Sequence, residues 1–547
     1  MLAPTTNEAC DAAYQSLLTR LDQQQAQIDA LQEQLRKTEQ ERDEYRKLLL
    51  LLRTQNESLK RGLLGQKAER LPTNDAQLTM AILGLVLSGA TDPDAAQGQP
   101  PAPEPEQTID AHTRKKPVRK PPPTDLPRVH IEILPPEVER QGLDAFTYIG
   151  SETREVLERR SASTVVVELE YKKFVPKDRE RNAATVVLAP QTVELPIVRG
   201  TAGPGLLADS LVRRWQDHQP LYRLEGIYGR EGLPLSRSTL CTWHEQLADL
   251  ARPLVEAMFT DARTSPYLCA DATGVLVQAK ERCRHGHFWV LVAPQRHVLY
   301  RYSRDHTKKA VDDLVSSYAG YLVVDAHVVY DHLFKDGTVI EVGCWAHCRR
   351  YFFKALESDP ERARAALSYI TALFRIEREV AEASPQKRQQ VRQVKSRPLV
   401  HQFFLWCDAE AERVLDQSPI ATGIGYARNQ RQALERFLED GRLPLHNNIS
   451  ELHLRRQVVG RHNWLFCGSD DGAEVNTIFV SLLASCQLHH IEPLGYLRDL
   501  LCLLPGWSRH RILELAPLHW QHTLQQPETQ QHLAANPLRR VVLGQLS

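Results

Sequence analysis

The sequence predicts a multidomain protein of the α plus α/β class, and three observations support that prediction. A heptad pattern fills the first part of the chain, a proline-rich stretch follows it, and strand-like apolar runs surround an amphipathic helix in the second half. Heptads predict paired helices, prolines interrupt regular structure, and a mixture of strands and helices predicts a layered sheet. A chain of 547 residues is long enough for several such domains.

Residues 15–65 show the pattern of a coiled coil that resembles a leucine zipper. With Leu21 and Ile28 at a positions and Leu31 at a d position, ten of the fourteen core positions are apolar. Such a stripe needs a partner helix, so we predict a homodimer or higher oligomer, and Asn56 at an a position favours a dimer. The alternative is a long helix that folds back on its own protein.

A linker and a small module follow the coiled coil. Residues 91–127 are predicted to be an extended tether, because ten prolines between Pro93 and Pro127 exclude regular helix and sheet. Its short basic run, residues 114–120, is interpreted as solvated unless it touches phosphate. Residues 128–200 alternate β-branched segments, which predicts a β-rich module.

Residues 203–258 are predicted to be a helical DNA-binding region with a helix-turn-helix. Gly232–Pro234 interrupts the helical pattern, and Ser236 is placed to cap the second helix. A recognition helix presents its first turns to the major groove. The candidate DNA-contacting residues there are Arg237, Ser238, Thr239 and Trp243. An ordinary helical hairpin is the alternative.

Residues 262–485 are predicted to be a ribonuclease-H-like core. Three strand candidates, a helix candidate and two further strand candidates follow in order: SPYLCADATGVLVQA, HGHFWVLVAP, RHVLYRYSR, HTKKAVDDLVSSYAG, GYLVVDAHVVY and TVIEVGCWAH. In a core of this kind the first and fourth strands lie side by side. A helical insertion is expected at about 349–440, and a helical tail at 486–547, of which the last forty residues are expected to have weak order.

Three carboxylates lie far apart in the sequence of this core, each at the end of a patterned segment. Asp271 and Asp325 follow short apolar runs, and Glu451 lies in a helix-compatible stretch that also carries Arg455, Arg456 and Arg461. Such acids can hold two divalent metal ions about 3.5–4 Å apart, an arrangement that stabilises the attacking and leaving oxygens in phosphoryl transfer. Magnesium or manganese suits carboxylates with open water positions. We therefore predict a nucleic-acid strand-transfer enzyme, whose arginines hold phosphates. A single Asp taken alone is more often a turn or cap residue.

Composition limits the other possibilities. Lys+Arg and Asp+Glu are both 68, so any contact with DNA must depend on local charge. The ten cysteines form no CxxC pair, which indicates reduced thiols in a cytoplasm. The run at Cys344, His347 and Cys348 lacks a fourth ligand, and Trp345 with the cysteines is interpreted as core. Neither a signal peptide nor a membrane span is predicted, so we expect a bacterial cytoplasmic protein, associated with the nucleoid when bound to DNA.

Several long segments together resemble transposases of the insertion sequence 66 (IS-66) family, of the DDE type. They are GLLADSLVRRWQDHQPLYRLEGIYGREGLPLSRSTLCTW, the strand that contains Asp271, GCWAHCRRYF, HNNISELHLRRQVVGRHNWLFCGSDDG and IEPLGYLRDLL. The resemblance covers most of the chain. It implies a metal-dependent DNA transposase that cleaves and joins insertion-sequence ends, with accessory proteins of the same element as further partners.

The resemblance also implies site residues. Asp271, Asp325 and Glu451 match the metal-binding acids. The residues that match the same site or its DNA-facing wall are Asn447, Asn448, Arg455, Arg461, Asn463 and Trp464. A buried tryptophan in the core is an equal alternative for Trp464.

The chain departs from the family pattern at three places. The family's zinc-binding module carries paired cysteines, but residues 111–240 contain none, so no zinc is expected there. His446 stands where the family usually has aspartate, and Leu452 where it usually has arginine. Because both flank the site, two alternatives stay open. One is a non-catalytic DNA-binding scaffold or regulator with a degenerate core, and the other is a metal-dependent nuclease or resolvase that cuts without joining.

Overall fold

The computed structural model describes residues 122–124, 126–160, 163–177, 192–280 and 282–545, and a few residues between 25 and 37. Two compact units are separated by their contacts: Met1–Arg119 with Leu415–Ser418, and Lys120–Val414 with Pro419–Ser547. The predicted coiled coil, residues 15–65, and most of the predicted linker, residues 91–127, therefore lie outside the described residues. The few that are described between 25 and 37 are helical, and their apolar side chains Ile28, Leu31 and Leu35 are exposed.

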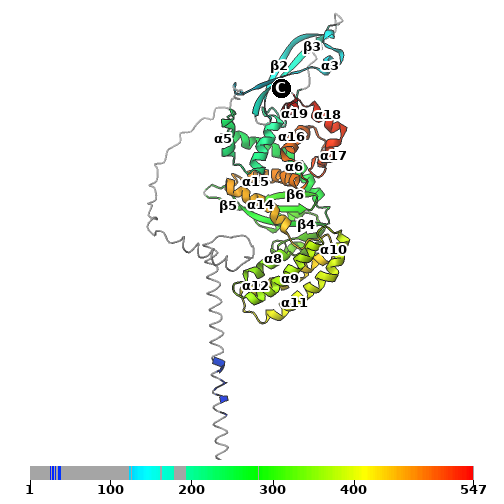
Figure 1. The fold of residues 1–547 in the computed structure, drawn as a ribbon. Coiled ribbons are helices and arrows are strands. Elements are labelled where there is room, and N and C mark those ends of the chain that lie inside the picture. The colour runs from blue at the N-terminus through cyan, green and yellow to red at the C-terminus, as the bar shows by residue number, and fades with distance from the viewer. Residues whose placement is uncertain are drawn as a thin grey trace, which may run out of the picture. The chain divides into compact units, whose positions relative to one another are not determined.

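A three-stranded sheet begins the described part of the second unit (Figure 1). Its strands are β1 (Arg128–Ile133), β2 (Phe146–Arg160) and β3 (Ser163–Pro176), with α3 (Pro136–Gln141) and the 3₁₀ turn η1 (Leu143–Ala145) between the first two. The order is β1-β3-β2; β1 runs parallel to β3, and β2 antiparallel to it. Val165 and Val167 of β3 pack in one buried cluster and Val166 in another, so both faces of the sheet are covered at this point.

The helical region consists of α4 (Pro204–Leu211), the π-helical turn η2 (Val212–Gln216), α5 (Leu221–Arg230) and α6 (Arg237–Ala262). The predicted pair of helices is present at α5 and α6, with Gly232 at φ 81° in the turn between them. Ser236 caps α6 as predicted, because its Oγ accepts from the Thr239 amide at 3.2 Å. Eleven of the 26 residues of α6 are buried.

The central sheet has five strands in the order β6-β5-β4-β7-β8. They are β4 (Tyr267–Val277), β5 (Arg284–Ala293), β6 (His297–Ser303), β7 (Gly320–Val323) and β8 (Val339–Val342), with α7 (Lys308–Val315) before β7. The first three are antiparallel, whereas β7 runs parallel to both β4 and β8. The prediction that the first and fourth strands lie side by side is confirmed by the pairing of β4 with β7.

A cluster of helices is inserted between β8 and the helix that carries Glu451, as predicted. Its elements are α8 (Trp345–Lys354), α9 (Pro360–Glu379), α10 (Pro385–Val391), η4 (Arg392–Ser396), α11 (Arg397–Ala411), α12 (Pro419–Asn429), α13 (Arg431–Glu435) and η5 (Arg436–Leu438). Aromatic side chains of α8 and α11 pack together in this cluster, where the rings of Trp345 and Phe352 both contact that of Phe403.

Two long helices return to the central sheet after the insertion. α14 (Asn448–Trp464) packs against β4 and β5, and α15 (Asp470–Leu488) against β6 (Figure 1). The backbone of the edge strand β6 is bound to α15 by serine hydroxyls, with Tyr300 N donating to Ser481 Oγ at 2.8 Å. Hydroxyls thus satisfy backbone groups that a further strand would otherwise pair.

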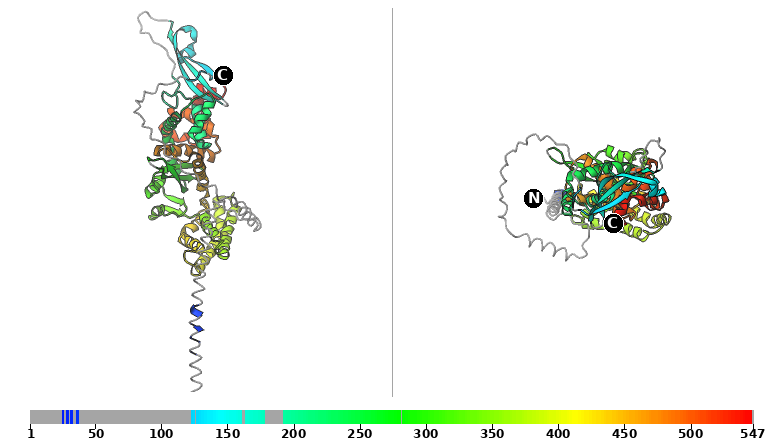
Figure 2. Two further views of the ribbon diagram at one scale, coloured as in Figure 1. Left: turned by 90° about the vertical axis from the view of Figure 1, so that its left-hand side faces the viewer. Right: turned by 90° about the horizontal axis from the view of Figure 1, so that it is seen from above.

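The C-terminal segment differs from the expectation of weak order. It forms α16 (Pro493–Leu503), η6 (Leu504–Gly506), η7 (Arg509–Leu515), α17 (Trp520–Gln525), α18 (Pro527–Ala535) and α19 (Pro537–Val542). Leu538 and Val541 of α19 are fully buried against the three-stranded sheet, beside which the chain ends (Figure 2). The expectation was wrong because a few apolar residues in a polar sequence are enough to anchor short helices on an existing core.

Candidate active site

The structure brings two of the predicted acids to neighbouring strands. Cys269 of β4 pairs with Val323 of β7, and the acids Asp271 and Asp325 each stand two residues further along. Because β4 and β7 are parallel, both acids lie at the same end of the strand pair. Asp325 lies just past β7, where its Oδ1 accepts from the amide of His327 at 3.2 Å.

The electrostatics of Asp271 show that carboxylates crowd together at this point. Burial and the charges of Asp325 and Glu451 together raise the pKa of Asp271 to about 7, although the amide of Ala272 and the guanidinium of Arg350 lower it. The amide of Ala272 donates to Asp271 Oδ1 at 2.7 Å. A partly buried group of three acids, with Arg350 as the cation that acts on Asp271, is an electrostatic condition that favours binding of a divalent metal.

Glu451 reaches the same place from the first turns of α14. Its Oε1 accepts from Arg350 Nη2 at 3.3 Å and lies 3.6 Å from His347 Nε2. Both partners are on α8, in the run GCWAHCRRYF that the sequence analysis interpreted as core. That interpretation is confirmed for Trp345 and the two cysteines, which are fully buried.

His347 and Arg350 are site residues that the sequence analysis missed. A signal for them was present in the helical spacing. The buried residues of α8 are Trp345, Cys348 and Phe352. His347 and Arg350 are three residues apart, so they lie on one side of the helix and outside this buried stripe.

Two predicted residues join α14 to β4. Asn447 is fully buried. Its side-chain Nδ2 donates to Ala270 O at 2.8 Å, and its backbone N–H donates to Cys344 Sγ at 3.1 Å. Arg461, at the far end of α14, donates from Nη1 to Thr273 Oγ1 at 3.1 Å and to the Gly274 carbonyl. The strand that holds Asp271 is therefore bound to the helix that holds Glu451 on both sides of the acid.

Replacing Asn447 by alanine is expected to lower the free energy of unfolding by about 1–3 kcal/mol, because the buried Ala270 carbonyl loses its donor. Ala270 precedes Asp271, so any cleavage activity should fall as well. Urea unfolding of the full chain measures the first effect. Asn463→Ala is the matched control, since the Asn463 amide bonds only to Val459 O in its own helix. Equal losses in both variants would contradict a positioning role for Asn447.

The remaining predicted residues fall into two groups. Asn448 and Arg455 are exposed on α14, and Arg237 and Ser238 are exposed at the start of α6, where Arg237 pairs with Glu225 at 2.9 Å. Trp464 and Trp243 are only 8% exposed and pack in hydrophobic clusters. The tertiary environment of both tryptophans is that of core residues. Thr239 bonds to the cap at Ser236, and Arg456 bonds to two glutamines.

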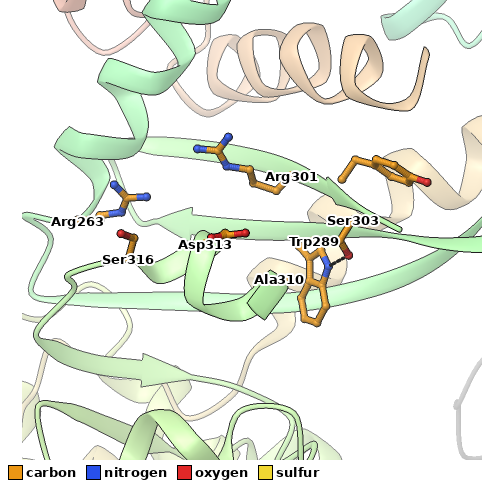
Figure 3. Close-up of a pocket in the computed structure, with 8 residues that line it drawn as sticks. Arg263, Trp289, Arg301, Ser303, Ala310, Asp313 and Ser316 are labelled. Carbon is orange, nitrogen blue, oxygen red and sulfur yellow. Dashed lines mark hydrogen bonds between the residues drawn. The ribbon is translucent and has the colours of Figure 1, made fainter. Parts of the chain in front are cut away.

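A hollow of about 400 Å³ lies away from the acids, against β6 and α7 (Figure 3). Its wall consists of Arg263, Trp289, Arg301, Tyr302, Ser303, Ala310, Asp313 and Ser316. None of the predicted site residues lines it. Trp289 donates to Ser303 Oγ at 2.7 Å and stacks on His306.

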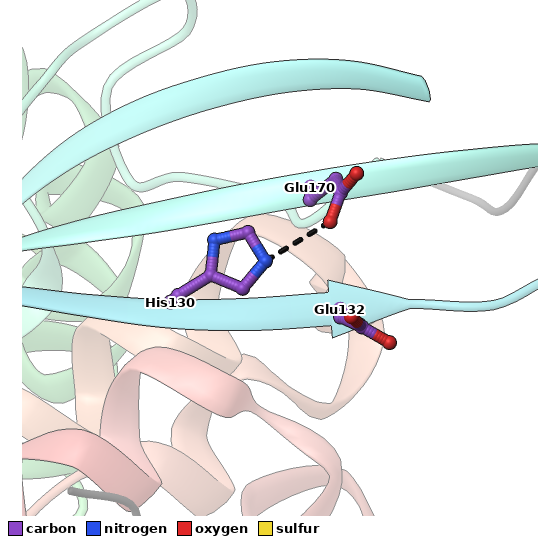
Figure 4. Close-up of side chains that lie close together, drawn as sticks. All are labelled: His130, Glu132 and Glu170. Atoms are coloured by element: carbon purple, nitrogen blue, oxygen red, sulfur yellow. Dashed lines mark hydrogen bonds and ion pairs between the residues drawn. The ribbon is translucent and has the colours of Figure 1, made fainter. Parts of the chain in front are cut away.

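A second group of possible metal ligands lies on the three-stranded sheet. In the described part of the chain, only His130, Glu132 and Glu170 bring three ligand atoms within 4.8 Å of one another (Figure 4). His130 and Glu170 bond to each other at 2.9 Å, and Glu132 pairs with Lys172, so these groups already have partners. The three acids of the candidate site are more widely spaced.

Comparisons with known proteins agree with this geometry. The pattern of the family described as "Transposase IS66 family" matches residues 199–475, which is about half of the chain and contains all three acids. A second pattern, "Transposase C of IS166 homeodomain", matches residues 51–131, across the end of the predicted coiled coil and the predicted linker. The chain belongs to the IS66 family of transposases, and DNA is its partner.

Relatives of similar length are known in Sinorhizobium fredii. The uncharacterized protein y4hP is 29% identical over 499 residues, which cover 86% of this chain and 89% of that protein. The uncharacterized protein y4qI is also 29% identical, over 85% of this chain and 87% of its own length. Within the described residues, no helix is both long enough and apolar enough to span a membrane.

Proposed function

We propose that this protein is a DDE transposase that cleaves the ends of an insertion sequence and joins them to target DNA. The observation that supports the proposal most directly is the meeting of Asp271, Asp325 and Glu451 from β4, the end of β7 and α14, within the segment that matches the transposase family. A ribonuclease-H-like arrangement is supported by the order β6-β5-β4-β7-β8 with its single change from antiparallel to parallel pairing.

The donor set fits magnesium or manganese. All three groups are hard carboxylate oxygens, and their mutual repulsion raises the pKa of Asp271. Divalent ions bound here supply Lewis-acid stabilisation of the phosphorane-like charge and an activated water or 3′-hydroxyl. Asp271, Asp325 and Glu451 are the residues that would hold the ions. No Ser or Tyr nucleophile is required.

The chain's own residues orient this chemistry. Asn447 and Arg461 hold α14 against β4, and Arg350 with His347 holds Glu451. Arg455 and Asn448 form the exposed wall beside Glu451 and contact the DNA strand. Arg237 and Ser238 present the start of α6 to the terminal repeat. The coiled coil at residues 15–65 joins two copies, which a reaction on two DNA ends requires.

The two departures from the family pattern leave the acids accessible. The ring of His446 stacks on Phe374 with centroids 5.6 Å apart, and Leu452 is 58% exposed. His446 Nδ1 accepts from the amide of Asn448 at 3.3 Å, and within the described residues neither side chain forms a hydrogen bond or ion pair with an acid of the site.

The test uses a labelled duplex that carries the native element's ends, with magnesium or manganese, and separates cleavage from joining on a gel. We expect wild-type protein to give both products and Asp325→Asn to give neither while it still binds the duplex. Cleavage without joined product, with accessory proteins of the element added, would indicate a nuclease. Binding without cleavage would indicate a scaffold.

A further inference from the structure

One surface beside α14 carries positive charge that no acid in the described structure balances. It is formed by Arg214 of η2, His218 in the following turn, and Arg456 of α14. His218 is held in the left-handed region at φ 57°, and its Nδ1 would lie 3.2 Å from a Cβ added at Gly460, so the ring rests directly on α14. We call these three residues the η2–α14 cluster.

The members of the cluster lie close enough to influence one another. Burial lowers the pKa of His218, and the charges of Arg456 and Arg214 lower it further. Arg456 Nη1 donates to Gln216 Oε1 at 2.5 Å, which fixes the arginine of α14 against η2. The second hydrogen bond of Arg456 goes to Gln487 Oε1 at 2.8 Å.

The partners of both arginines are neutral. The guanidinium of Arg214 lies 4.5 Å from the ring centroid of Trp215 and 5.8 Å from that of Trp464, and its Nη1 donates to the Gln219 carbonyl. Neither Arg214 nor Arg456 forms an ion pair with any described residue. The neighbouring Arg213, in contrast, pairs with Asp209 at 2.8 Å.

Keeping such charges partly buried is costly. Burial lowers the pKa of Arg214 to about 10 and also lowers that of Arg456. A partly buried cation without a carboxylate partner loses hydration, and an anion bound beside it offsets that loss. The planar fork of arginine, fixed here by tryptophans and glutamines, matches the geometry of a phosphate group.

We infer that the η2–α14 cluster binds a phosphate of the DNA backbone, at a place separate from the three acids and from the start of α6. The inference rests on the proposed function in that DNA is taken as the ligand. Free inorganic phosphate has the same chemistry as a backbone phosphate, so the test compares binding of DNA with binding of inorganic phosphate. A backbone contact of this kind positions the duplex without reading its sequence.

The sharpest variant adds an anion without removing a cation. In Gln216→Glu, a carboxylate replaces the amide whose oxygen already accepts from Arg456, so the arginine gains an ion pair and the fold keeps all its contacts. Gln521→Glu, an exposed glutamine of α17, makes the same change of charge elsewhere and is the matched control. Arg456→Gln is the complementary variant that deletes the cation.

The measurement is fluorescence anisotropy of a random-sequence duplex with the full chain over a range of salt concentrations. We expect Gln216→Glu and Arg456→Gln each to weaken binding about tenfold and to reduce the slope of log K against log salt by about 1. The affinity of Gln521→Glu for the duplex should stay within about twofold of the wild-type affinity, because this variant leaves the cluster unchanged. Gln216→Glu should unfold at the same or a higher temperature than wild type.

Three outcomes would overturn the inference. The first is an equal loss in Gln216→Glu and Gln521→Glu, the second is an unchanged salt slope in Arg456→Gln, and the third is a loss of affinity for inorganic phosphate with unchanged affinity for DNA. Failure of the proposed chemistry is a separate result. Asp325→Asn should bind the duplex with the wild-type salt slope whether or not wild-type protein cleaves.

Discussion

Replacing Asp271 by asparagine is expected to abolish DNA cleavage, with the rate falling at least about a thousandfold, or about 4 kcal/mol of transition-state stabilisation. The charges of both other acids act on Asp271, so its loss would remove one of the three carboxylates that would hold the ions. Binding of Mn²⁺, followed by electron paramagnetic resonance on the full chain, should weaken at least about tenfold for the same reason. Binding of DNA should persist.

The same substitution should make the metal-free protein more stable, which separates loss of chemistry from misfolding. Above pH 7 the wild-type carboxylate is charged although burial and two neighbouring acids oppose that charge. Asparagine removes the repulsion, so its melting temperature without metal should be higher at pH 8. Asp336→Asn, an exposed aspartate of the same domain, is the control and should change neither property. Cleavage by Asp271→Asn within about tenfold of wild type would rule out the assignment.

The second large effect is expected at Glu158, which is fully buried where β2 meets α4. Its Oε1 accepts from the amides of Arg159 at 2.8 Å and Leu206 at 2.7 Å. Burial raises its pKa from 4.5 to about 8, and the amides of Arg159, Leu206 and Gly205 oppose that rise only in part. Between these two values the folded state holds one proton that the unfolded state has lost.

The pH dependence follows from that proton. The stability that protonated Glu158 provides is fully present below pH 4.5 and is lost as the pH rises through about 8. Within this window the group lowers the free energy of unfolding by about 1.4 kcal/mol for each pH unit. Glu158→Gln keeps an acceptor at Oε1 but does not titrate. Its stability relative to wild type should therefore increase with pH across the window.

Urea unfolding of both proteins at about pH 5.5 and about pH 7.5 measures this difference, on the order of 2 kcal/mol between the two conditions. Glu155→Gln serves as control, because Glu155 is a partly exposed glutamate of the same strand that bonds to Arg128. A constant difference between Glu158→Gln and wild type would show that Glu158 does not hold a proton in the fold.

Local patterns predicted most of the central fold. Short apolar runs ending in Asp271 and Asp325 became β4 and β7, and their parallel pairing followed from the order of strands and helix. The cap at Ser236 could also be predicted, since a serine before a helix acts within four residues. In contrast, the order of the C-terminal helices depends on the burial of Leu538 and Val541 against residues far away in sequence.

What the sequence by itself determined is therefore the pairing of the first and fourth strands and the cap of α6, because each rests on residues near one another or on a topological rule. What only the tertiary structure decided are the contacts across long separations. Arg350 and His347 meet Glu451 from about a hundred residues away, Asn447 holds Ala270, and Trp464 packs in the core. The lack of an acidic partner for Arg214 and Arg456 is likewise decided only by the tertiary structure. Whether an arginine has an acidic partner is a property of the packed neighbours, and no periodicity in the chain reports it.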